Sequence, residues 1–188
     1  TNLGNLLYNE RKDVDGAEKA YRAAIEADPG YANAYANLGL LLHSERKDVD
    51  GAEKAYRAAI EADPGYAKAH VILGQLLQNA RRDVNGAEKA YRAAIEADPR
   101  HAYAHFNLAL LLYHERKDLD GAEAAYRAAT AADSTLALAF VNLGFLLKNE
   151  RKDLDGAEAA YRAAIEADPG HAYSHFNLAL LLYHERKD

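Results

Sequence analysis

The sequence contains no cysteine, methionine or tryptophan, and its 188 residues include only four prolines. Without cysteine the chain can form no disulfide, thiolate metal site or cysteine nucleophile. No apolar run approaches the roughly 18 residues that a membrane-spanning helix needs. Basic residues do not predominate either: 23 Lys and Arg against 29 Asp and Glu give a net charge of −6 at pH 7, which disfavours a nucleic acid partner.

The composition is typical of a folded, soluble domain, with 49% hydrophobic and 28% charged residues. The sequence starts at Thr1, and no basic, apolar and small-residue leader follows, so no targeting signal can be read. We therefore expect a cytoplasmic protein.

One period of 35 residues governs the whole chain. A segment that begins Gly-Ala-Glu-Lys-Ala-Tyr-Arg and ends in Asp-Pro occurs identically at 16–29, 51–64 and 86–99, with one change at 156–169, and more loosely at 121–133. Self-similarity of this kind is typical of repeat architectures, so we expect a single domain without linkers. The predicted repeat units are 1–29, 30–64, 65–99, 100–134, 135–169 and the half repeat 170–188.

Each repeat predicts two helices. In the second repeat, Asp50 followed three residues later by Glu53 predicts a capping box that starts the second helix, and Asp63-Pro64 ends it because proline supplies no amide donor. The first helix carries two apolar stripes on different faces. One hairpin cannot bury both, so we expect neighbouring hairpins to stack into an all-α solenoid of helix-turn-helix units.

This pattern resembles the tetratricopeptide repeat. In the second repeat the resemblance is carried by Tyr35, Leu38, Gly39, Leu42, Ala52, Tyr56, Ala59 and Pro64. It extends over the entire chain and implies a right-handed superhelix, with first helices that line a concave groove and a non-catalytic role in holding peptides or proteins. Two features depart from the family pattern. The period is one residue longer than usual, in the turn around 46–51, and Asp133-Ser134-Thr135 lacks the proline, which predicts a local bend.

The repeats differ mainly on the inner stripe of their first helices, so binding specificity is expected on the concave side. The last three repeats place aromatic and aliphatic side chains there, and such a surface usually marks a binding groove. Alternatively, the superhelix buries these side chains in itself or against its own copy. The predicted peptide-binding residues are Asn37, Lys68, Tyr103, Phe106, Asn107, Leu110, Tyr113, Val141, Asn142, Phe145, Tyr173, Phe176, Asn177 and Leu180.

Asparagine recurs at one first-helix position, as Asn37, Asn107, Asn142 and Asn177, with Ile72 interrupting the row. A carboxamide offers both a donor and an acceptor, so the row could pair with an extended peptide backbone. It is similar to the asparagine ladder in the tetratricopeptide superhelix of O-linked N-acetylglucosamine transferases. Equally, each amide could hydrogen-bond a neighbouring helix.

Other chemistries have less support in the sequence. The family's dicarboxylate clamp is matched only in part, by Asn5, Asn37 and Lys68. His101 and His105 share a helix face, as does a second such pair, but no third ligand is spaced to join them, so we expect structural or surface histidines and no metal. There is no phosphate loop, nucleophilic triad or buried carboxylate pair, so neither a cofactor nor an enzyme activity is predicted.

The last predicted helix, 172–185, carries the apolar stripe of the other first helices, and no second helix follows it in this sequence. We expect His175, Leu178 and Leu182 to pair with a second copy as a homodimer. A peptide-binding scaffold, a self-associating structural solenoid and the substrate-recruiting arm of a larger enzyme all stay open. The near-identical second helices also fit an engineered array or a fragment of a longer one.

Overall fold

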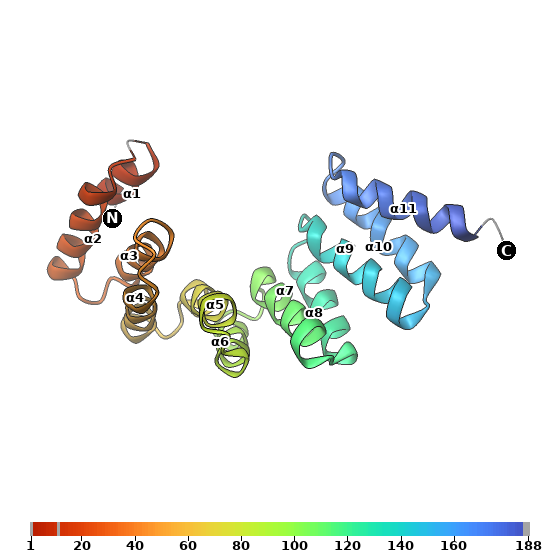
Figure 1. Ribbon diagram of the computed structural model, residues 1–188, viewed down its shortest axis with the longest axis horizontal. Coiled ribbons are helices and arrows are strands. Elements are labelled where there is room, and N and C mark those ends of the chain that lie inside the picture. Colours follow the sequence, from red (N-terminus) through yellow and green to blue (C-terminus); the bar gives the residue numbers. More distant parts are fainter. Residues whose placement is uncertain (1, 11, 186–188) are drawn as a thin grey trace. The chain divides into compact units, whose positions relative to one another are not determined.

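The computed structural model describes residues 2–10 and 12–185, and within them the chain forms only helices and turns (Figure 1). The predicted all-α fold of helical hairpins is confirmed. The chain divides into two compact units, residues 1–99 and 100–188, at a predicted repeat boundary. That the two units act as one solenoid stays a prediction.

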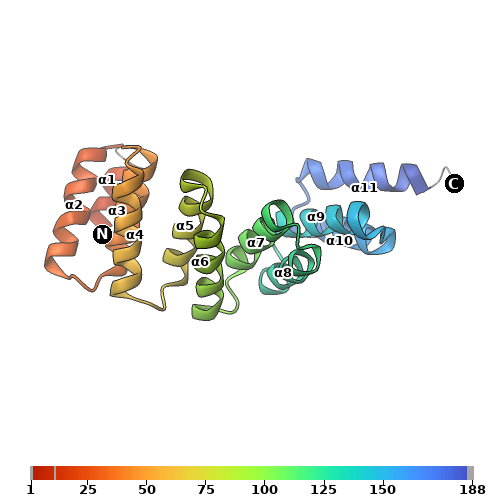
Figure 2. The same cartoon turned by 60° about the horizontal axis from the view of Figure 1, so that its bottom comes forward.

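Unit 1 consists of three hairpins, each with a first and a second helix. Consecutive helices pack against one another in chain order, so that each hairpin lies on the next (Figures 1 and 2). The elements are α1 (Asn2–Asn9), α2 (Val14–Ala27), α3 (Ala32–Ser44), α4 (Val49–Ala62), α5 (Ala67–Leu76) with the π-helical turn η1 (Leu77–Arg81), and α6 (Val84–Ala97).

Unit 2 repeats this arrangement with two hairpins and a further first helix. Here too, each helix packs on its neighbour in sequence, from the first hairpin to the last helix. The elements are α7 (Ala102–Leu111) with η2 (Leu112–Arg116), α8 (Leu119–Ala132), α9 (Ala137–Leu146) with η3 (Leu147–Arg151), α10 (Leu154–Ala167) and α11 (Ala172–Glu185).

The interior of each hairpin is built from small residues around one tyrosine of the second helix. In α4, Tyr56 is buried between Ala52 and Ala59. Gly39 of α3 lies against its ring, because a Cβ on Gly39 would stand 2.5 Å from Tyr56 Cε1. The glycine therefore lets the two helices approach closely. In α7, Ala109 takes the equivalent place and is also buried.

The extra residue of the 35-residue period is accommodated where each first helix ends. The last turn widens into a π-helical turn in α5, α7 and α9. After η2, Lys117 adopts a left-handed φ of 57°. The amide of Asp118 then donates to the carbonyl of Leu112 at 3.0 Å, six residues earlier. The usual Schellman motif closes over five residues, so this turn is the same device lengthened by one.

The second helices begin two residues earlier than the sequence predicted. Asp48 is the N-cap of α4, and the Gly51 amide donates to its carboxylate at 2.9 Å. The predicted capping box of Asp50 and Glu53 is therefore wrong, because Asp50 already lies within the first turn. Both acidic side chains instead pair with Arg81 of the next hairpin; Glu53 Oε2 lies 3.0 Å from its Nε.

The turn that lacks proline keeps the conformation of the others, so the expected local bend is also wrong. Asp133 has φ −141° and ψ 102°, against −142° and 96° at Asp168, which precedes a proline. The backbone amide and hydroxyl of Thr135 donate to Asp133 Oδ1 at 2.8 and 2.7 Å. These hydrogen bonds fix the turn without a proline, and they lower the pKa of Asp133 below its usual value.

Candidate functional site

Large apolar side chains are exposed along the first helices of unit 2. Tyr103 on α7, Leu138 and Phe145 on α9, and Tyr173 and Phe176 on α11 are each between 40% and 60% exposed. The corresponding positions of unit 1 hold mostly polar residues. An exposed apolar surface of this kind is typical of an interaction site.

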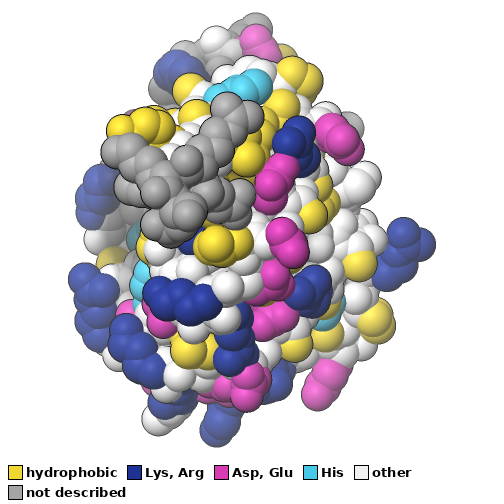
Figure 3. Space-filling view, turned by 90° about the vertical axis from the view of Figure 1, so that its right-hand side faces the viewer, with side chains coloured by type: hydrophobic (Ala, Val, Ile, Leu, Met, Phe, Trp, Pro, Cys, Tyr) yellow, Lys and Arg dark blue, Asp and Glu magenta, His cyan; other side chains and the backbone are white. Residues whose placement is uncertain are grey.

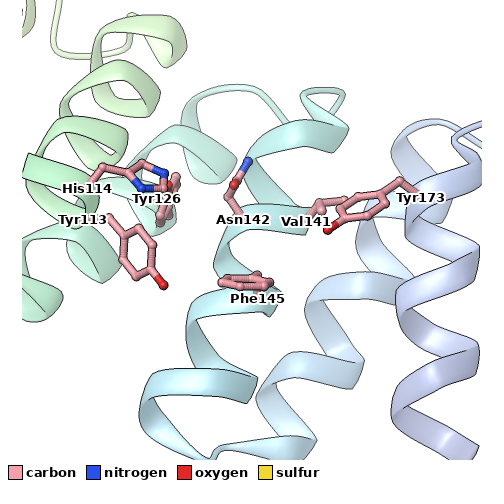
Figure 4. A pocket seen from close by; sticks show the side chains of 7 residues that line it. All are labelled: Tyr113, His114, Tyr126, Val141, Asn142, Phe145 and Tyr173. Atoms are coloured by element: carbon pink, nitrogen blue, oxygen red, sulfur yellow. The ribbon is translucent and has the colours of Figure 1, made fainter.

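A pocket of about 200 Å³ opens among these side chains, within unit 2 (Figure 4). Three first helices and one second helix contribute to its wall, so the pocket exists only because consecutive hairpins stack. Its lining residues are Tyr113, His114, Tyr126, Val141, Asn142, Phe145 and Tyr173.

Two rings form a corner of the pocket. Tyr113 and Phe145 meet edge to face, with centroids 6.5 Å apart and planes at 87°. The Tyr113 hydroxyl donates to Glu150 Oε1 at 2.9 Å, and His114 packs edge-on against the same ring at 4.8 Å. Desolvation, and then the bond to Glu150, raise the pKa of Tyr113. The hydrogen bond to Glu150 and the ring contact with His114 therefore both fix the Tyr113 ring, which keeps the aromatic wall of the pocket in place.

The asparagine amides of unit 2 are oriented by their own helices. Asn107, Asn142 and Asn177 each donate one N–H to the carbonyl four residues earlier, at 2.7 Å in every case. They do not brace a neighbouring helix through this bond. Asn142 stands on the pocket wall, whereas Asn177 is buried. Asn142 is therefore the amide of the row that a ligand in the pocket would meet.

In unit 1, the polar side chains of the same face bond mainly to one another. Asn37 Nδ2 donates to Asn5 Oδ1 at 3.2 Å, and the same oxygen accepts from the Tyr21 hydroxyl at 2.8 Å. Lys68 is exposed at the start of α5. The structure thus places Asn37 and Lys68 in a different unit from the pocket, where Asn37 already has a partner.

The structure brings together only some of the predicted groove residues. Phe106 packs on Tyr126 with ring centroids 6.1 Å apart and is half-buried. Leu110 and Leu180 are half-buried as well. Sequence reasoning missed two lining residues, His114 and Tyr126. A tyrosine that recurs in every second helix indicates a scaffold role, although Tyr126 also reaches the pocket.

The exposed face of α11 differs from the predicted stripe. Leu178 and Leu182 stay half-buried, and His175 is exposed with its Nε2 2.9 Å from the Pro169 carbonyl oxygen. The larger exposure falls on Phe176, at 60%. Its counterpart in α7 is covered by the second-helix tyrosine, so α11 presents an aromatic face without that cover.

Several histidines take part in local structure. His101 caps α7, since its Nδ1 accepts from the Ala104 amide at 3.3 Å, and His171 Nδ1 lies 2.7 Å from Ser174 Oγ. Among the described residues no group of three or more His, Asp or Glu could hold a metal ion. Nor does any helix there have the length and apolar character to cross a membrane. Figure 3 shows acidic and basic side chains interspersed over the face it presents.

The model of the tetratricopeptide repeat family matches residues 1–67, 73–137 and 149–188. No curated protein matches the sequence.

Solved structures share the fold at low sequence identity. The structure of pilF of Pseudomonas aeruginosa is 23% identical, with 99% of this chain and 83% of that chain covered and a TM-score of 0.81. MamA is 22% identical, with 88% and 94% covered and a TM-score of 0.71. YrrB, a TPR protein with an unusual peptide-binding site, is 24% identical, with 93% and 88% covered and a TM-score of 0.66.

Proposed function

The chain belongs to the tetratricopeptide repeat family, and we propose that unit 2 binds an extended peptide segment of a partner protein along its first helices. The observation that carries this proposal is the aromatic pocket bordered by Tyr113, Phe145 and Tyr173. Exposed apolar side chains on α7, α9 and α11 continue the surface on both sides of it. A protein partner is also what the family generally binds.

The size of the pocket favours one side chain as its occupant. Its volume of about 200 Å³ is below the roughly 300–1,000 Å³ of sites that hold drug-sized ligands. Aromatic walls attract apolar or aromatic groups and exclude water from them. We therefore expect a large apolar or aromatic residue of the peptide to serve as the anchor.

The carboxamide of Asn142 supports the proposal because it offers hydrogen-bonding groups on the pocket wall. One of its N–H groups is occupied by the Leu138 carbonyl at 2.7 Å, which fixes the plane of the amide. The carboxamide oxygen and the second N–H can then pair with a peptide backbone beside the anchor, whatever the neighbouring side chains are. An oriented amide loses little entropy on binding, so the hydrogen bond adds to affinity.

The test compares two truncations of equally exposed side chains. Phe145 lines the pocket and Leu154 lies outside it on α10, and both are 40% exposed. Peptides are selected from a displayed random library on the parent chain, and their affinities are measured by calorimetry. Phe145→Ala should weaken binding by at least about tenfold, because buried aromatic anchors dominate interface energy, while Leu154→Ala should leave it unchanged.

Two results would overturn the proposal. Equal affinity for the parent and Phe145→Ala would place the peptide elsewhere. So would selected peptides that lack large apolar residues. Circular dichroism of each variant confirms that the helices persist, and Tyr173→Ala provides a second change in the same pocket that leaves the hairpin cores untouched.

Self-association is a second candidate, favoured by the exposed aromatic face of α11. Phe176 is 60% exposed and Tyr183 is 55% exposed on this helix. We propose that two copies of the 188-residue chain can bury these faces against each other. Sedimentation at increasing concentration should then show a dimer for the parent and a monomer for Phe176→Glu. A parent that stays monomeric would exclude this candidate without affecting the peptide site.

We also propose that the chain is a non-catalytic, cytoplasmic scaffold. As the substrate-recruiting arm of a larger enzyme it would use the same pocket, and only the attached catalytic domain would differ. Fusing the chain to an unrelated reporter enzyme tests the binding role alone: the fusion should retain a selected peptide, and a loss of peptide binding in the fusion would count against an independent scaffold.

A further inference from the structure

The first-helix residue that precedes the second-helix tyrosine by 13 positions lies beside the hydroxyl group of that tyrosine. In unit 1 the Tyr91 hydroxyl donates to Gln78 Oε1 at 3.0 Å, across this separation. In unit 2, Tyr113 stands the same distance before Tyr126 and contributes to its raised pKa. In the hairpin of α5 and α6 this position therefore supplies an acceptor for the buried tyrosine.

The hairpin of α9 and α10 lacks such a bond among the described residues. The corresponding residues are Lys148 and Tyr161, again 13 apart. Tyr161 is completely buried, and within the described part of the chain its hydroxyl has no hydrogen-bond partner. Lys148 offers this hydroxyl no acceptor, because an ammonium group has three donors and no acceptor, whereas the glutamine of unit 1 offers a carbonyl oxygen.

Within the described residues, neither the Tyr161 hydroxyl nor the Lys148 ammonium group donates to an acceptor. Burial raises the pKa of Tyr161 to about 12, so its hydroxyl stays protonated and can donate at neutral pH. Lys148 is half-buried and forms no ion pair or hydrogen bond with the described residues. A buried donor without a partner is costly and uncommon in folded proteins, so a bound ligand that supplies an acceptor would be favoured at this place.

The two donors adjoin the aromatic pocket. Lys148 follows Phe145 by three residues, less than one turn further along the same continuous helical segment. Tyr173, another lining residue, contributes to the raised pKa of Tyr161. An acceptor bound here would lie next to the side chain that fills the pocket.

We propose that Lys148 and Tyr161 bind a carboxylate of the peptide, next to its apolar anchor. The ammonium group of Lys148 neutralises the charge, and the Tyr161 hydroxyl donates the second hydrogen bond. The long flexible stem of the lysine allows it to move toward the carboxylate and open the way to the hydroxyl. This inference rests on the proposed function, since it assigns the chemistry of the residue beside the anchor.

A carboxylate can come from two sources, an aspartate or glutamate side chain or the C-terminus of the partner. The experiment distinguishes them with two random peptide libraries, one displayed with a free C-terminus and one with the C-terminus fused. If the site binds an acidic side chain, we expect peptides selected on the parent chain to carry an acidic residue near the anchor in both libraries. Enrichment of terminal anchors in the free library alone would identify the C-terminal carboxylate.

The decisive variant is Lys148→Gln, which recreates the pairing of Gln78 with Tyr91. It should retain the apolar anchor and lose the acidic preference. For a synthetic peptide selected on the parent, replacing the acid by its amide should weaken binding by about tenfold or more, as expected for a hydrogen bond to a charged group, but should have little effect with Lys148→Gln. Lys117→Gln removes the same charge from an exposed turn and serves as the control.

Tyr161→Phe removes the hydroxyl and leaves the charge of Lys148 in place. This variant should therefore reduce the preference for an acidic residue only in part. Anchored peptides without an acidic preference on the parent would overturn this inference and leave the proposed function standing. An unchanged preference in Lys148→Gln would overturn it as well. If no selected peptide depends on Phe145, the proposed function itself fails, and the inference fails with it.

Discussion

The hydroxyl of Tyr113 donates to the carboxylate of Glu150, 37 residues further along the chain, at 2.9 Å. The bond joins η2 to η3 and thus ties two consecutive first helices together at one side of the pocket. Tyr8 and Glu45 in unit 1 repeat it with the same separation and the same length. The bridge therefore recurs where this tyrosine and glutamate are both present, and in unit 2 it also holds one wall of the candidate site.

Removing this bridge should separate its structural from its binding role. Tyr113→Phe keeps the ring in the pocket and removes the donor of the hydrogen bond, and Glu150→Ala removes the acceptor. A double-mutant cycle with urea unfolding should give a coupling of about 0.5–1.5 kcal/mol, as for a partly solvated hydrogen bond. Peptide affinity should change little in Tyr113→Phe and fall clearly in Tyr113→Ala.

An affinity equally reduced in Tyr113→Phe and Tyr113→Ala would show that the hydroxyl, and not the ring, contacts the peptide. A coupling near zero would show that the bridge contributes nothing to stability in solution.

The position of the N-cap yields another prediction. Asp118 accepts the Gly121 amide at 2.9 Å at the start of α8, whereas Asp120 is exposed and pairs with Arg151. Replacing an N-cap by alanine typically costs about 1 kcal/mol. Asp118→Ala should therefore lower the free energy of unfolding by about that amount, and Asp120→Ala should barely change it. Thermal and urea unfolding measure both, and the reverse order would restore the capping box expected from the sequence.

The repeat period and the Asp-Pro helix ends were sufficient to predict the fold, because they depend on local residue types. The N-cap was not predictable in the same way. Asp48 and Asp50 lie two residues apart, and the glutamate at position 53 favoured Asp50 as the cap. The lengthened turn decides between the two aspartates, since the left-handed residue before Asp48 brings that aspartate to the helix start.

The candidate site was only partly predictable. The predicted inner stripe includes Tyr113, Phe145 and Tyr173, and all three line the pocket because stacking brings the inner stripes of consecutive first helices together. Tyr126 was not predicted, since every second helix carries this tyrosine and comparison between repeats reveals only differences. The sequence could not show that the Tyr161 hydroxyl has no partner among the described residues, because this depends on how α9 and α10 are aligned with each other.

The left-handed turn residues offer a route to higher stability. Lys117 has φ 57°, a conformation that costs a residue with a Cβ roughly 1–2 kcal/mol and costs glycine nothing. Part of this gain is offset by the greater entropy of glycine in the unfolded chain. Lys117→Gly should therefore raise the free energy of unfolding by roughly 0.5–1 kcal/mol, and Lys117→Ala, which keeps the Cβ, should not. A destabilised glycine variant in urea unfolding would argue against a strained turn.

The buried second-helix tyrosines predict a loss of stability in alkali. Burial raises the pKa of Tyr56 and of Tyr161 from 10.0 to about 12, so the folded state holds these protons more tightly than the unfolded chain. Their contribution is complete below pH about 10 and is lost as the pH rises from there toward 12. Helicity should fall over this range, with tyrosinate absorbance from the buried rings appearing only as the helices melt. Tyr56→Phe should make the loss of helicity with pH shallower, whereas Tyr103→Phe, which alters an exposed ring, should not. Ionisation of every tyrosine at its ordinary pKa with helicity intact would contradict the prediction.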